Sequence, residues 1–363
     1  MTMAAPDPAG DDRTITGLRV EVTTALLKAP FVTSVRRADA AQIVVVEARD
    51  AAGRVGMGEA AVSWRVTGES PQSVTAAVAG PLSDVVVGRV PHDRILTQDI
   101  AAAVWGNASA RNAVECAVAE LRSAQTGNAV WQRLGARSPS VRTDRTLSAA
   151  TPRELAAAAV RHCEEGFGVL KVKVRAADDT VAGVREVRAA VGDGVRLRID
   201  ANQAWTADEA IRVIREMERA GVDLEFVEQP VAADDLPALA AVAAAVETPV
   251  MADESVRTAA DVRTMAERTS VALVNIKLAK TGGLAAAERA AAVAREHGIG
   301  VVVGCMLEGP VGITAAAGFA AAIAPDVVHD LDGAHWLAEP PLTDRTATFR
   351  GDTILLPTAP EDR

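Results

Sequence analysis

Charged side chains recur along the second half of this chain in an order that suits proton transfer beside a metal ion. The five positions, in chain order, are Lys173, Asp200, Glu228, Asp253 and Lys277. Three carboxylates without His or Cys form a hard oxygen donor set, which favours Mg2+, or Mn2+, over zinc. A divalent cation would relieve the repulsion between the acids, and a lysine amine can remove or return a proton at a substrate carbon.

Short β-branched runs carry these residues, and their regular spacing predicts a barrel. Eight runs follow residue 145 and alternate with Ala-rich amphipathic stretches, and their ends lie 24 to 28 residues apart. Each interval fits one strand, one helix of about three turns and two short loops, which is the repeat of a (β/α)8-type barrel. A doubly wound sheet is the rival α/β fold. Its Gly-rich motif belongs after the first strand, whereas Gly282 and Gly283 follow the sixth run here.

Strand alternation predicts which side chains face the barrel interior. In the run VRLRIDAN, the apolar residues Leu197 and Ile199 share one parity, while Arg198, Asp200 and Asn202 share the other. We expect the polar set to face inward. The carboxyl ends of barrel strands carry the active site in such enzymes, so the acids are expected at the mouth of the barrel.

The lysines are expected on opposite walls. The same alternation places Lys171 and Lys173 inside the second strand and Lys277 inside the sixth. These strands face each other in an eight-stranded barrel, so a proton could leave one face of a carbon and return to the other. Lys171 is a like charge near Lys173 and would favour the neutral amine of Lys173.

Other polar residues are interpreted as structural or surface residues. Lys280 has the opposite parity to Lys277 and is expected in a loop or on the surface, and Cys305 is expected to be a small buried residue. The histidines show no metal-ligand spacing. A structural alternative for the charged set is an ion-pair network that closes the barrel top, but such a network does not explain three acids on adjacent strands flanked by lysines.

Composition excludes several classes of protein. The chain has 363 residues, 49% of them hydrophobic, and a net charge of −10. We expect a globular protein that binds neither nucleic acid nor anionic membranes. Three widely spaced cysteines, no apolar run long enough to span a bilayer and no signal-like start lead us to expect a cytoplasmic location.

The sequence divides into four parts. We expect a disordered tail over residues 1–13 and an α+β capping domain over 14–140, with a three-part antiparallel meander followed by helices. The barrel is expected over 141–335. Residues 336–363 are expected to return to the cap.

A family resemblance rests on five motifs. LKVKV, IDANQAW, VEQP, ADES and NIKLAKTGG, in this order, resemble the muconate-lactonizing subgroup of the enolase superfamily over residues 17–340. The resemblance implies a modified (β/α)7β TIM-type barrel with an N-terminal α+β capping domain. It also implies Mg2+ ligands at Asp200, Glu228 and Asp253, an acid/base pair at Lys173 and Lys277, and supporting roles that we assign to Lys171 and Asn202.

The five motifs do not separate the reactions of this subgroup. Its members include muconate cycloisomerases, o-succinylbenzoate synthases, N-acylamino acid racemases and dipeptide epimerases. Asp330 and Asp332 resemble the pair with which dipeptide epimerases hold the substrate ammonium group, although a turn or helix cap is an alternative role for them. GCMLEG, which contains Glu308, also resembles the epimerases, and Glu308 is expected to contact substrate.

Substrate preference is expected to come from the cap. Arg36 matches a position where epimerases acting on Ala-Glu carry an arginine that pairs with the γ-carboxylate, although a loop arginine is ordinarily solvated. The favoured function is therefore a Mg2+-dependent isomerase that inverts the second residue of L-Ala-L-Glu by two-lysine proton transfer through an enolate. A lyase, racemase or cycloisomerase and a non-catalytic barrel are the alternatives. Members of this family often form oligomers, so a homo-oligomer is expected.

Overall fold

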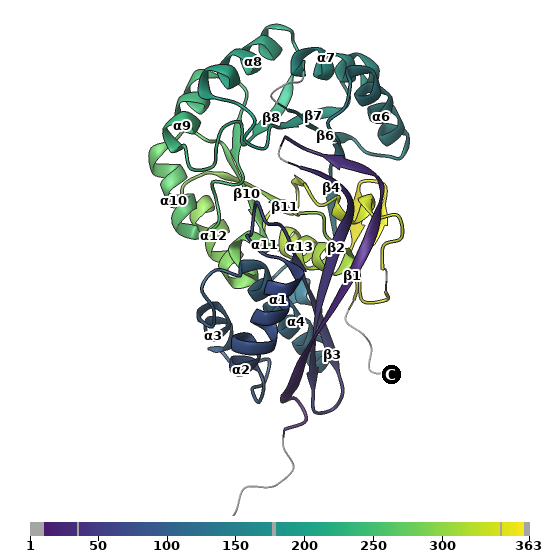
Figure 1. Cartoon of the computed structure of the whole chain (residues 1–363), viewed down its shortest axis with the longest axis vertical. Coiled ribbons are helices and arrows are strands. Elements are labelled where there is room, and N and C mark those ends of the chain that lie inside the picture. The colour runs from purple at the N-terminus through teal and green to yellow at the C-terminus, as the bar shows by residue number, and fades with distance from the viewer. Residues whose placement is uncertain (1–10, 35, 176–178, 342, 359–363) are drawn as a thin grey trace, which may run out of the picture.

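A computed structural model gives the fold of the chain and describes residues 11–34, 36–175, 179–341 and 343–358 (Figure 1). Most of the expected N-terminal tail, residues 1–10, lies outside these ranges, as do residues 342 and 359–363 of the expected C-terminal segment. The described residues form an α/β barrel and a separate N-terminal sheet with helices packed on it.

The N-terminal unit is built on an antiparallel sheet, which confirms the predicted meander. Its strands lie in the order β1 (Ile15–Val32), β2 (Arg37–Asp50) and β3 (Val55–Ala61). One long helix, α4 (Ala108–Thr126), crosses β3 so closely that β3 requires glycine. A Cβ atom on Gly58 would lie 2.0 Å from the Ala113 carbonyl oxygen of α4.

The remaining helices of this unit are short. Residues 73–88 do not form one continuous helix, because the segment is interrupted where Pro81 follows Gly80, whose φ of −107° and ψ of −110° are not helical. The helical segments are α1 (Pro71–Ala77), η1 (Val78–Leu82), α2 (Ser83–Val86), α3 (Leu96–Ala102), α4 (Ala108–Thr126) and α5 (Val130–Arg133).

The barrel strands are parallel and follow the chain in order around the sheet. They are β5 (Arg145–Leu147), β6 (Val169–Lys173), β7 (Arg196–Asp200), β8 (Leu224–Glu228), β9 (Val250–Ala252), β10 (Leu273–Lys277) and β11 (Gly300–Gly304). The last run forms β12 (Val328–His329), which pairs with β4 (Ser140–Thr143) directly before β5. A bridge between Gly304 and Asp330 joins β11 to the end of β12. This arrangement is the (β/α)7β barrel implied by the resemblance.

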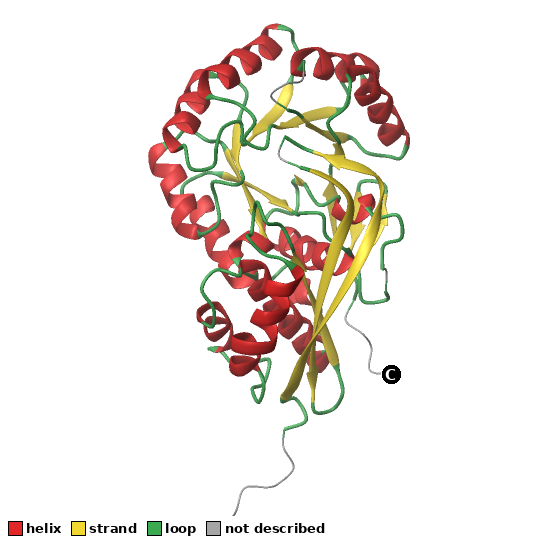
Figure 2. Ribbon diagram, viewed as in Figure 1, coloured by secondary structure: helices red, strands yellow, loops and turns green. Residues whose placement is uncertain are grey.

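Helices surround the barrel strands on the outside (Figure 2). They are α6 (Pro152–Glu164), α7 (Thr180–Val191), α8 (Ala207–Arg219), α9 (Leu236–Ala245), α10 (Ala259–Arg268), α12 (Leu284–Glu296) and α13 (Pro310–Ile323), with a single turn, α11 (Leu278–Thr281), after β10. The sequence marks several starts with capping boxes, such as Thr206 with Glu209 at α8.

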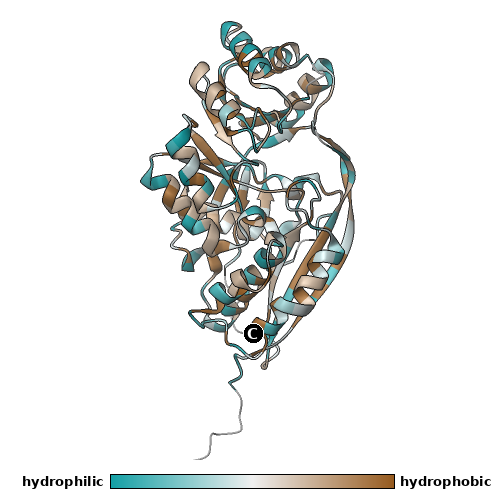
Figure 3. Ribbon diagram, turned by 60° about the vertical axis from the view of Figure 1, so that its left-hand side comes forward, coloured by the Kyte–Doolittle hydropathy of each residue, from teal (hydrophilic) through white to brown (hydrophobic). Residues whose placement is uncertain are grey.

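Strand alternation separates two apolar layers. Leu197 and Ile199 of β7 belong to the large core between the strands and the outer helices. Phe226, Met251 and Val302 form a small cluster with the opposite parity, inside the barrel. In Figure 3, brown marks hydrophobic residues in the strands, and the helices carry both brown and teal residues.

Carboxylates from the N-terminal unit attach it to the barrel helices. Glu59 of β3 accepts hydrogen bonds from Gly309 N at 2.6 Å and Gly312 N at 2.9 Å, at the start of α13. Glu115 of α4 accepts from Ala285 N at 2.8 Å, at the start of α12. Both helices begin at a glycine without a side-chain cap, so the N-terminal unit supplies the missing acceptors.

The C-terminal segment contacts both units. After η2 (Gly333–Trp336), Ala338 N donates to Leu26 O of β1 at 2.8 Å, and Arg345 forms an ion pair with Glu120 of α4 at 3.3 Å. The chain ends in β13 (Thr348–Arg350) and β14 (Thr353–Leu355), and β14 pairs with β4. Among the described helices, none is long and apolar enough to cross a membrane.

Candidate active site

Three buried acids lie side by side at the carboxyl end of the barrel sheet. Asp200 ends β7, Glu228 ends β8, and Asp253 follows β9 directly. Asp200 and Glu228 are partners in the β7–β8 register, and β8 pairs with β9. The three residues are 0%, 0% and 2% exposed. Adjacent strands of one sheet thus bring three carboxylates to one end of the barrel.

Lysines approach these acids from opposite sides. Lys173 lies on β6 and Lys277 on β10, and the three strands that carry the acids lie between them. Lys173 Nζ is 2.5 Å from Asp200 Oδ2, and Lys277 Nζ is 2.8 Å from Asp253 Oδ2. The structure therefore brings together the two amines and the acids between them, as the sequence spacing suggested.

Lys171 occupies the middle of the acid cluster. Its Nζ lies 2.6 Å from Glu228 Oε2, 2.7 Å from Asp330 Oδ2 and 3.0 Å from Asp200 Oδ2. Burial alone would lower the pKa of Lys171, but the surrounding carboxylates raise it well above its usual value. Three carboxylates therefore compensate the charge of Lys171, so this charge does not act on Lys173 alone.

The acids differ in how much positive charge each receives. Burial opposes ionisation of Asp200, yet Lys171 and Lys173 hold its pKa below the usual range. Asp253 behaves in the same way because Lys277 and a second lysine contact it. Burial, with the nearby charge of Asp200, raises the pKa of Glu228 to about 8. Negative charge around Glu228 is therefore incompletely neutralised.

The donor set fits a hard divalent cation. As they stand, no three or more His, Cys, Asp or Glu side chains in the described ranges are arranged to hold a metal ion, and lysine amines contact the acids instead. Neutral groups orient one oxygen of two acids: Asn202 N donates to Asp200 Oδ1 at 2.9 Å, and Asn275 Nδ2 to Glu228 Oε1 at 2.9 Å. The other oxygen of each faces an ammonium group, which is the environment that a bound cation would replace.

Asn202 stands where the chain leaves β7. Its φ of 42° is in the left-handed region, which asparagine tolerates better than most residues. Its Nδ2 donates to Glu254 Oε1 at 3.2 Å, and its carbonyl accepts from Ser34 Oγ of the β1–β2 connection at 2.7 Å. Asn202 thus links the acid cluster to the N-terminal unit, in agreement with a supporting position.

A cleft of about 70 Å3 opens above these groups, between the barrel mouth and the N-terminal unit. The candidate residues among its lining are Arg36, Lys173, Asn202, Asp253, Lys277, Asp330 and Asp332.

Asp330 and Asp332 both lie in the cleft wall, and both are already paired. Asp330 contacts Lys171, and Asp332 Oδ2 accepts from Thr146 N at 2.8 Å, Trp336 Nε1 at 3.1 Å and Arg145 Nη1 at 3.2 Å. Asp332 precedes η2 without capping it through its side chain. The pair therefore belongs to the cleft and not to a helix cap.

Arg36 reaches the cleft from the β1–β2 connection. It is half-buried, its guanidinium lies 5.8 Å from the centroid of the Phe31 ring, and burial lowers its pKa. Among the described residues, no carboxylate lies within ion-pair distance of Arg36. Its neighbour Arg37 is exposed and pairs with Asp39 at 3.0 Å, so the two arginines have different environments.

Glu308, which is expected to contact substrate, does not line the cleft in this structure. Glu308 is buried, because the loop after β11 turns its carboxylate back onto its own backbone. Met306 N donates to Glu308 Oε1 at 2.8 Å, and Met306 itself takes the place in the cleft wall.

The expectation that Lys280 lies in a loop or on the surface is wrong. The chain enters α11 immediately after Lys277, so strand parity no longer applies and residues three apart share one side of a helix. Lys280 is 3% exposed, and its Nζ lies 2.5 Å from Asp253 Oδ1.

Sequence reasoning missed three further groups in the cleft or its wall. Glu254 lines the cleft beside Asp253, Arg145 pairs with Asp332, and the Arg145 guanidinium stacks 4.9 Å from the centroid of the Trp336 ring. Arg145 stands directly before the first β-branched run, and a charged residue at the start of a predicted strand was the available signal for it. Trp336 lies beyond the last run and carried no such signal.

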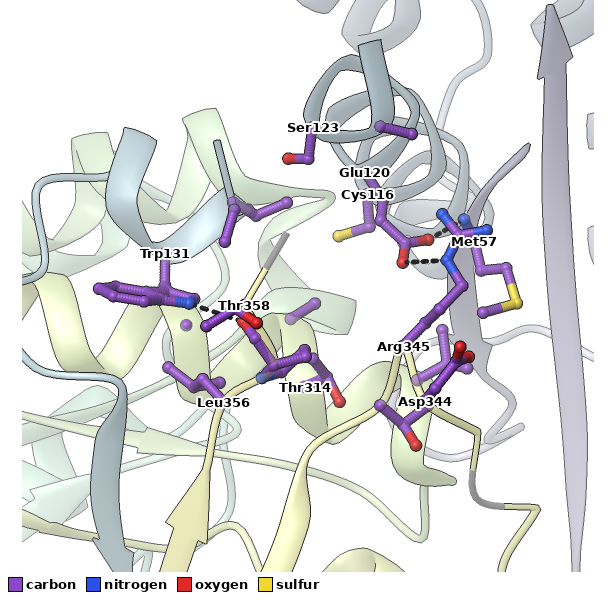
Figure 4. Close-up of a pocket in the computed structure, with 18 of the residues that line it drawn as sticks. Met57, Cys116, Glu120, Ser123, Trp131, Thr314, Asp344, Arg345, Leu356 and Thr358 are labelled. Carbon is purple, nitrogen blue, oxygen red and sulfur yellow. Dashed lines mark hydrogen bonds and ion pairs between the residues drawn. The ribbon is translucent and has the colours of Figure 1, made fainter. Parts of the chain in front are cut away.

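A larger cavity lies elsewhere. It measures about 630 Å3 and is bounded by α4, α5, α13 and the C-terminal segment (Figure 4). Within it, Glu120 and Arg345 point toward each other, and Glu120 also accepts from Met57 N. Glu120 and Arg345 form an ion pair here, and none of the acid and lysine cluster lines this cavity. The smaller cleft is therefore the candidate active site.

Comparison with known proteins agrees with the architecture and the motifs. The family model for the mandelate racemase / muconate lactonizing enzyme N-terminal domain matches residues 15–135, and the enolase C-terminal domain-like model matches residues 154–360. The L-Ala-D/L-Glu epimerase of Bacillus subtilis (strain 168) is 39% identical over 338 residues, which cover 92% of this chain and 92% of that protein.

Solved structures extend the likeness to three dimensions. A substrate-liganded complex of the L-Ala-D/L-Glu epimerase from Bacillus subtilis has a TM-score of 0.92 at 37% identity, and the match covers 96% of this chain and 97% of that chain. The dipeptide epimerase from Enterococcus faecalis V583, complexed with Mg and the dipeptide L-Leu-L-Tyr, has a TM-score of 0.90 at 31% identity, covering 95% and 98%.

Proposed function

Because this chain belongs to the mandelate racemase / muconate lactonizing enzyme family of the enolase superfamily and is an isomerase, we propose that it is a Mg2+-dependent dipeptide epimerase. The proposed reaction inverts the α-carbon of the C-terminal residue of an L,L-dipeptide. The names of the relatives and the Mg-dipeptide complexes of structural neighbours support this proposal.

One observation carries the proposal. Lys173 and Lys277 approach a common cleft from β6 and β10, and the strands of the acid cluster separate them. A base and an acid on opposite faces of one carbon are what inversion requires. A hydrolase or a simple binding site has no need of two amines in this relation.

The two amines would exchange roles between the two directions of the reaction. One Nζ, in its neutral form, takes the α-proton from one face of the substrate, and the ammonium of the other lysine returns a proton to the opposite face. Each transfer of this kind contributes about 10²- to 10⁴-fold in rate. Microscopic reversibility then assigns Lys173 to one epimer and Lys277 to the other.

Asp200, Glu228 and Asp253 would hold the cation, and Asn202 and Lys171 would support them. When bound, Mg2+ supplies positive charge that stabilises the second negative charge on the carboxylate of the enolised substrate. The geometry of Glu228 supports this assignment, because its Oε2 shares the one ammonium group of Lys171 with Asp200 and Asp330. Mn2+, which prefers similar oxygen ligands, is a possible substitute.

The amino end of the substrate is assigned to Asp330 and Asp332. Both carboxylates line the cleft at the carboxyl end of β12, and each retains acceptor capacity beyond its contacts with Lys171 and Arg145. A dipeptide ammonium bound there would place the second α-carbon toward the two lysines. This assignment favours a dipeptide over an N-acylated amino acid.

We assign the side chain of the second residue to Arg36, with L-Ala-L-Glu as the preferred substrate. A half-buried guanidinium in the cleft wall without a carboxylate partner among the described residues suits a γ-carboxylate, and a planar guanidinium can bind both oxygens.

The test is an isotope-exchange screen. The protein with Mg2+ in D2O should exchange the α-proton of the C-terminal residue of L-Ala-L-Glu, followed by NMR, and convert it to the L,D epimer. A panel with acidic, basic and apolar C-terminal residues ranks the side chains. Absence of exchange across the whole panel would disprove the proposal.

A lyase or cycloisomerase acting on a dicarboxylate without an amine is separated by the same assay. Asp330 and Asp332 should repel such a substrate, whereas the epimerase depends on them. Efficient turnover of an o-succinylbenzoate precursor, unchanged when both residues become Asn, would favour that alternative.

We further propose the four-part division at residues 13, 140 and 335, a homo-oligomer and a cytoplasmic location. Val22 and Leu26 on the edge strand β1 are 46% and 68% exposed, which supports association through this face. The three cysteines are free, as expected in a reducing compartment. Light scattering of the purified protein tests the oligomer.

A further inference from the structure

The feature that the proposed mechanism leaves unused is Lys280. Its side chain is fully buried, yet it does not line the cleft, and its ammonium lies behind Asp253. A lysine is costly to bury unless its charge and its donors are satisfied. A buried amine beside the acid cluster that faces away from the cleft therefore requires an explanation.

Three acceptors surround the Lys280 ammonium. Its Nζ contacts Asp253 Oδ1 at 2.5 Å, the Asn275 carbonyl oxygen at 3.1 Å and the Asp253 carbonyl oxygen. An ammonium group has three N–H donors, so this set uses all of them. No donor remains for a substrate, which separates Lys280 from Lys277, whose amine reaches the cleft.

The backbone contacts of Lys280 join two strands where their ladder ends. The β9–β10 pairing consists of Leu273 with Met251 and Val274 with Ala252, and it stops before Asp253. Beyond that point the Lys280 ammonium connects the Asp253 carbonyl with the Asn275 carbonyl of β10. Gln229 Oε1 holds Asp253 N from the other side at 2.9 Å. Asp253 is thus fixed by side chains at a position where the sheet no longer fixes it.

The two lysines also divide the oxygens of Asp253. Lys280 contacts Oδ1 and Lys277 contacts Oδ2. Lys280 is held by two backbone carbonyls as well, while the contact of Lys277 is with the carboxylate alone among the described residues. Oδ2 is therefore the oxygen that can exchange an ammonium for a cation, and Lys277 is the amine that can leave.

We propose that Lys280 is a positioning residue that fixes the Asp253 carboxylate for the metal and so leaves Lys277 free to act on substrate. This inference rests on the Mg2+ site of the proposed function. The proposal predicts that removing Lys280 changes Mg2+ affinity in the direction opposite to the one that simple electrostatics predicts. Removing a positive charge near a cation site normally tightens cation binding, whereas removing this one should weaken it, because Asp253 loses its orientation.

The experiment measures Mg2+ binding by calorimetry, without substrate, to the wild type, Lys280→Met, Lys280→Gln and Lys277→Met. Lys280→Met should raise the Kd for Mg2+ by about 10-fold or more, the usual cost of losing a group that orients a metal ligand. Lys280→Gln keeps N–H donors and should restore part of the affinity. Lys277→Met should bind Mg2+ as tightly as the wild type or more tightly, and Lys28→Met, on the exposed part of β1, should leave the Kd unchanged.

Rates separate positioning from catalysis. At saturating Mg2+, Lys280→Met should recover most of the wild-type kcat, whereas Lys277→Met should not. Unchanged or tighter Mg2+ binding by Lys280→Met would overturn the proposal. If that variant does not fold, Lys280→Gln decides, since tighter binding than the wild type would overturn the proposal equally. A wild type that binds Mg2+ but exchanges no dipeptide α-proton would disprove the epimerase function alone.

Discussion

The barrel buries charged groups at two levels, and the two levels differ in how completely each cation is paired. At the lower level, Arg198 of β7 donates to Asp144 at 2.7 Å, to Glu225 at 2.7 Å and to the Val328 carbonyl at 2.8 Å. Its guanidinium also stacks 4.8 Å from the centroid of the Phe226 ring. Arg198 has no contact with the cleft.

At the mouth, two residues further along β7 than Arg198, the pairing of charged side chains is incomplete. The single ammonium group of Lys171 is shared among Asp200, Glu228 and Asp330. The lower group links β7 with β8, β12 and the start of β5, so it holds the barrel together. The structural ion network considered for the whole charged set describes this lower level, whereas the mouth retains unbalanced charge that a cation and a substrate can use.

The largest expected effect tests the mouth. Lys277→Met and Lys173→Met should each lower the rate of dipeptide epimerisation by about 10²- to 10⁴-fold, because each removes one proton transfer. Neither should lower Tm appreciably, since Asp253 keeps Lys280 and Asp200 keeps Lys171. NMR exchange in D2O and calorimetric unfolding measure the two quantities. A variant with a much lower Tm that still exchanges the α-proton at the wild-type rate below that temperature would contradict this prediction. It would show that the lysine stabilises the fold and does not transfer a proton.

Arg198→Met tests the lower level. Removing one partner of a buried ion pair should reduce the free energy of unfolding by about 3–5 kcal/mol, because Asp144 is left uncompensated. Urea denaturation measures this loss. Arg196→Met is the matched control, since Arg196 lies on the same strand and also pairs with Glu225 but is exposed, so its cost should be about 0–1 kcal/mol. Equal losses for the two variants would contradict the distinction between the levels.

Arg36→Ala tests whether the guanidinium of Arg36 in the cleft wall binds the substrate side chain. A hydrogen-bonded charge pair is worth about 1.5–3 kcal/mol, so kcat/KM for L-Ala-L-Glu should fall about 10- to 100-fold. Activity on a dipeptide with an apolar second residue should change little. Arg37→Ala is the control, because Arg37 already pairs with Asp39. A uniform loss across substrates would assign Arg36 to packing on Phe31 and not to specificity.

Alternation within strands made much of this site predictable. Lys173, Asp200, Glu228 and Lys277 all lie on regular strands, so parity and spacing were enough to place them at one end of the barrel. The same reasoning found the barrel order, because each run is bounded by a helix of ordinary length.

The prediction failed where the strands end. Lys280 lies in a helical turn that begins at once after β10, so its position does not follow a period of two. Arg145 and Asp332 are separated by 187 residues, and a single sequence contains no signal for such a pair. Tertiary contacts of this kind determine which charged side chains at the mouth already have a partner.

A third buried acid, Glu59, lies at the contact between the N-terminal unit and α13. Burial and the nearby Glu308 raise the pKa of Glu59 to about 8, against the N–H groups of Gly309 and Gly312. The folded protein therefore keeps a proton that the unfolded chain, with a pKa near the ordinary 4.5, releases. Native stability from this group is present below about pH 4.5 and is lost as pH rises toward 8.

Glu59→Gln should therefore flatten the pH dependence of stability. The wild type should lose up to about 1.4 kcal/mol per pH unit relative to the variant between pH 5 and 8, since that is the free energy of one titrating group. Denaturation at several pH values measures the difference, and Glu21→Gln, on the exposed side of β1, should leave the profile parallel to the wild type. Because Glu59 does not line the cleft, Mg2+ affinity should stay constant. Parallel profiles for Glu59→Gln and the wild type would show that its N–H partners balance burial, which would place Glu59 with the well-paired charges of the lower barrel.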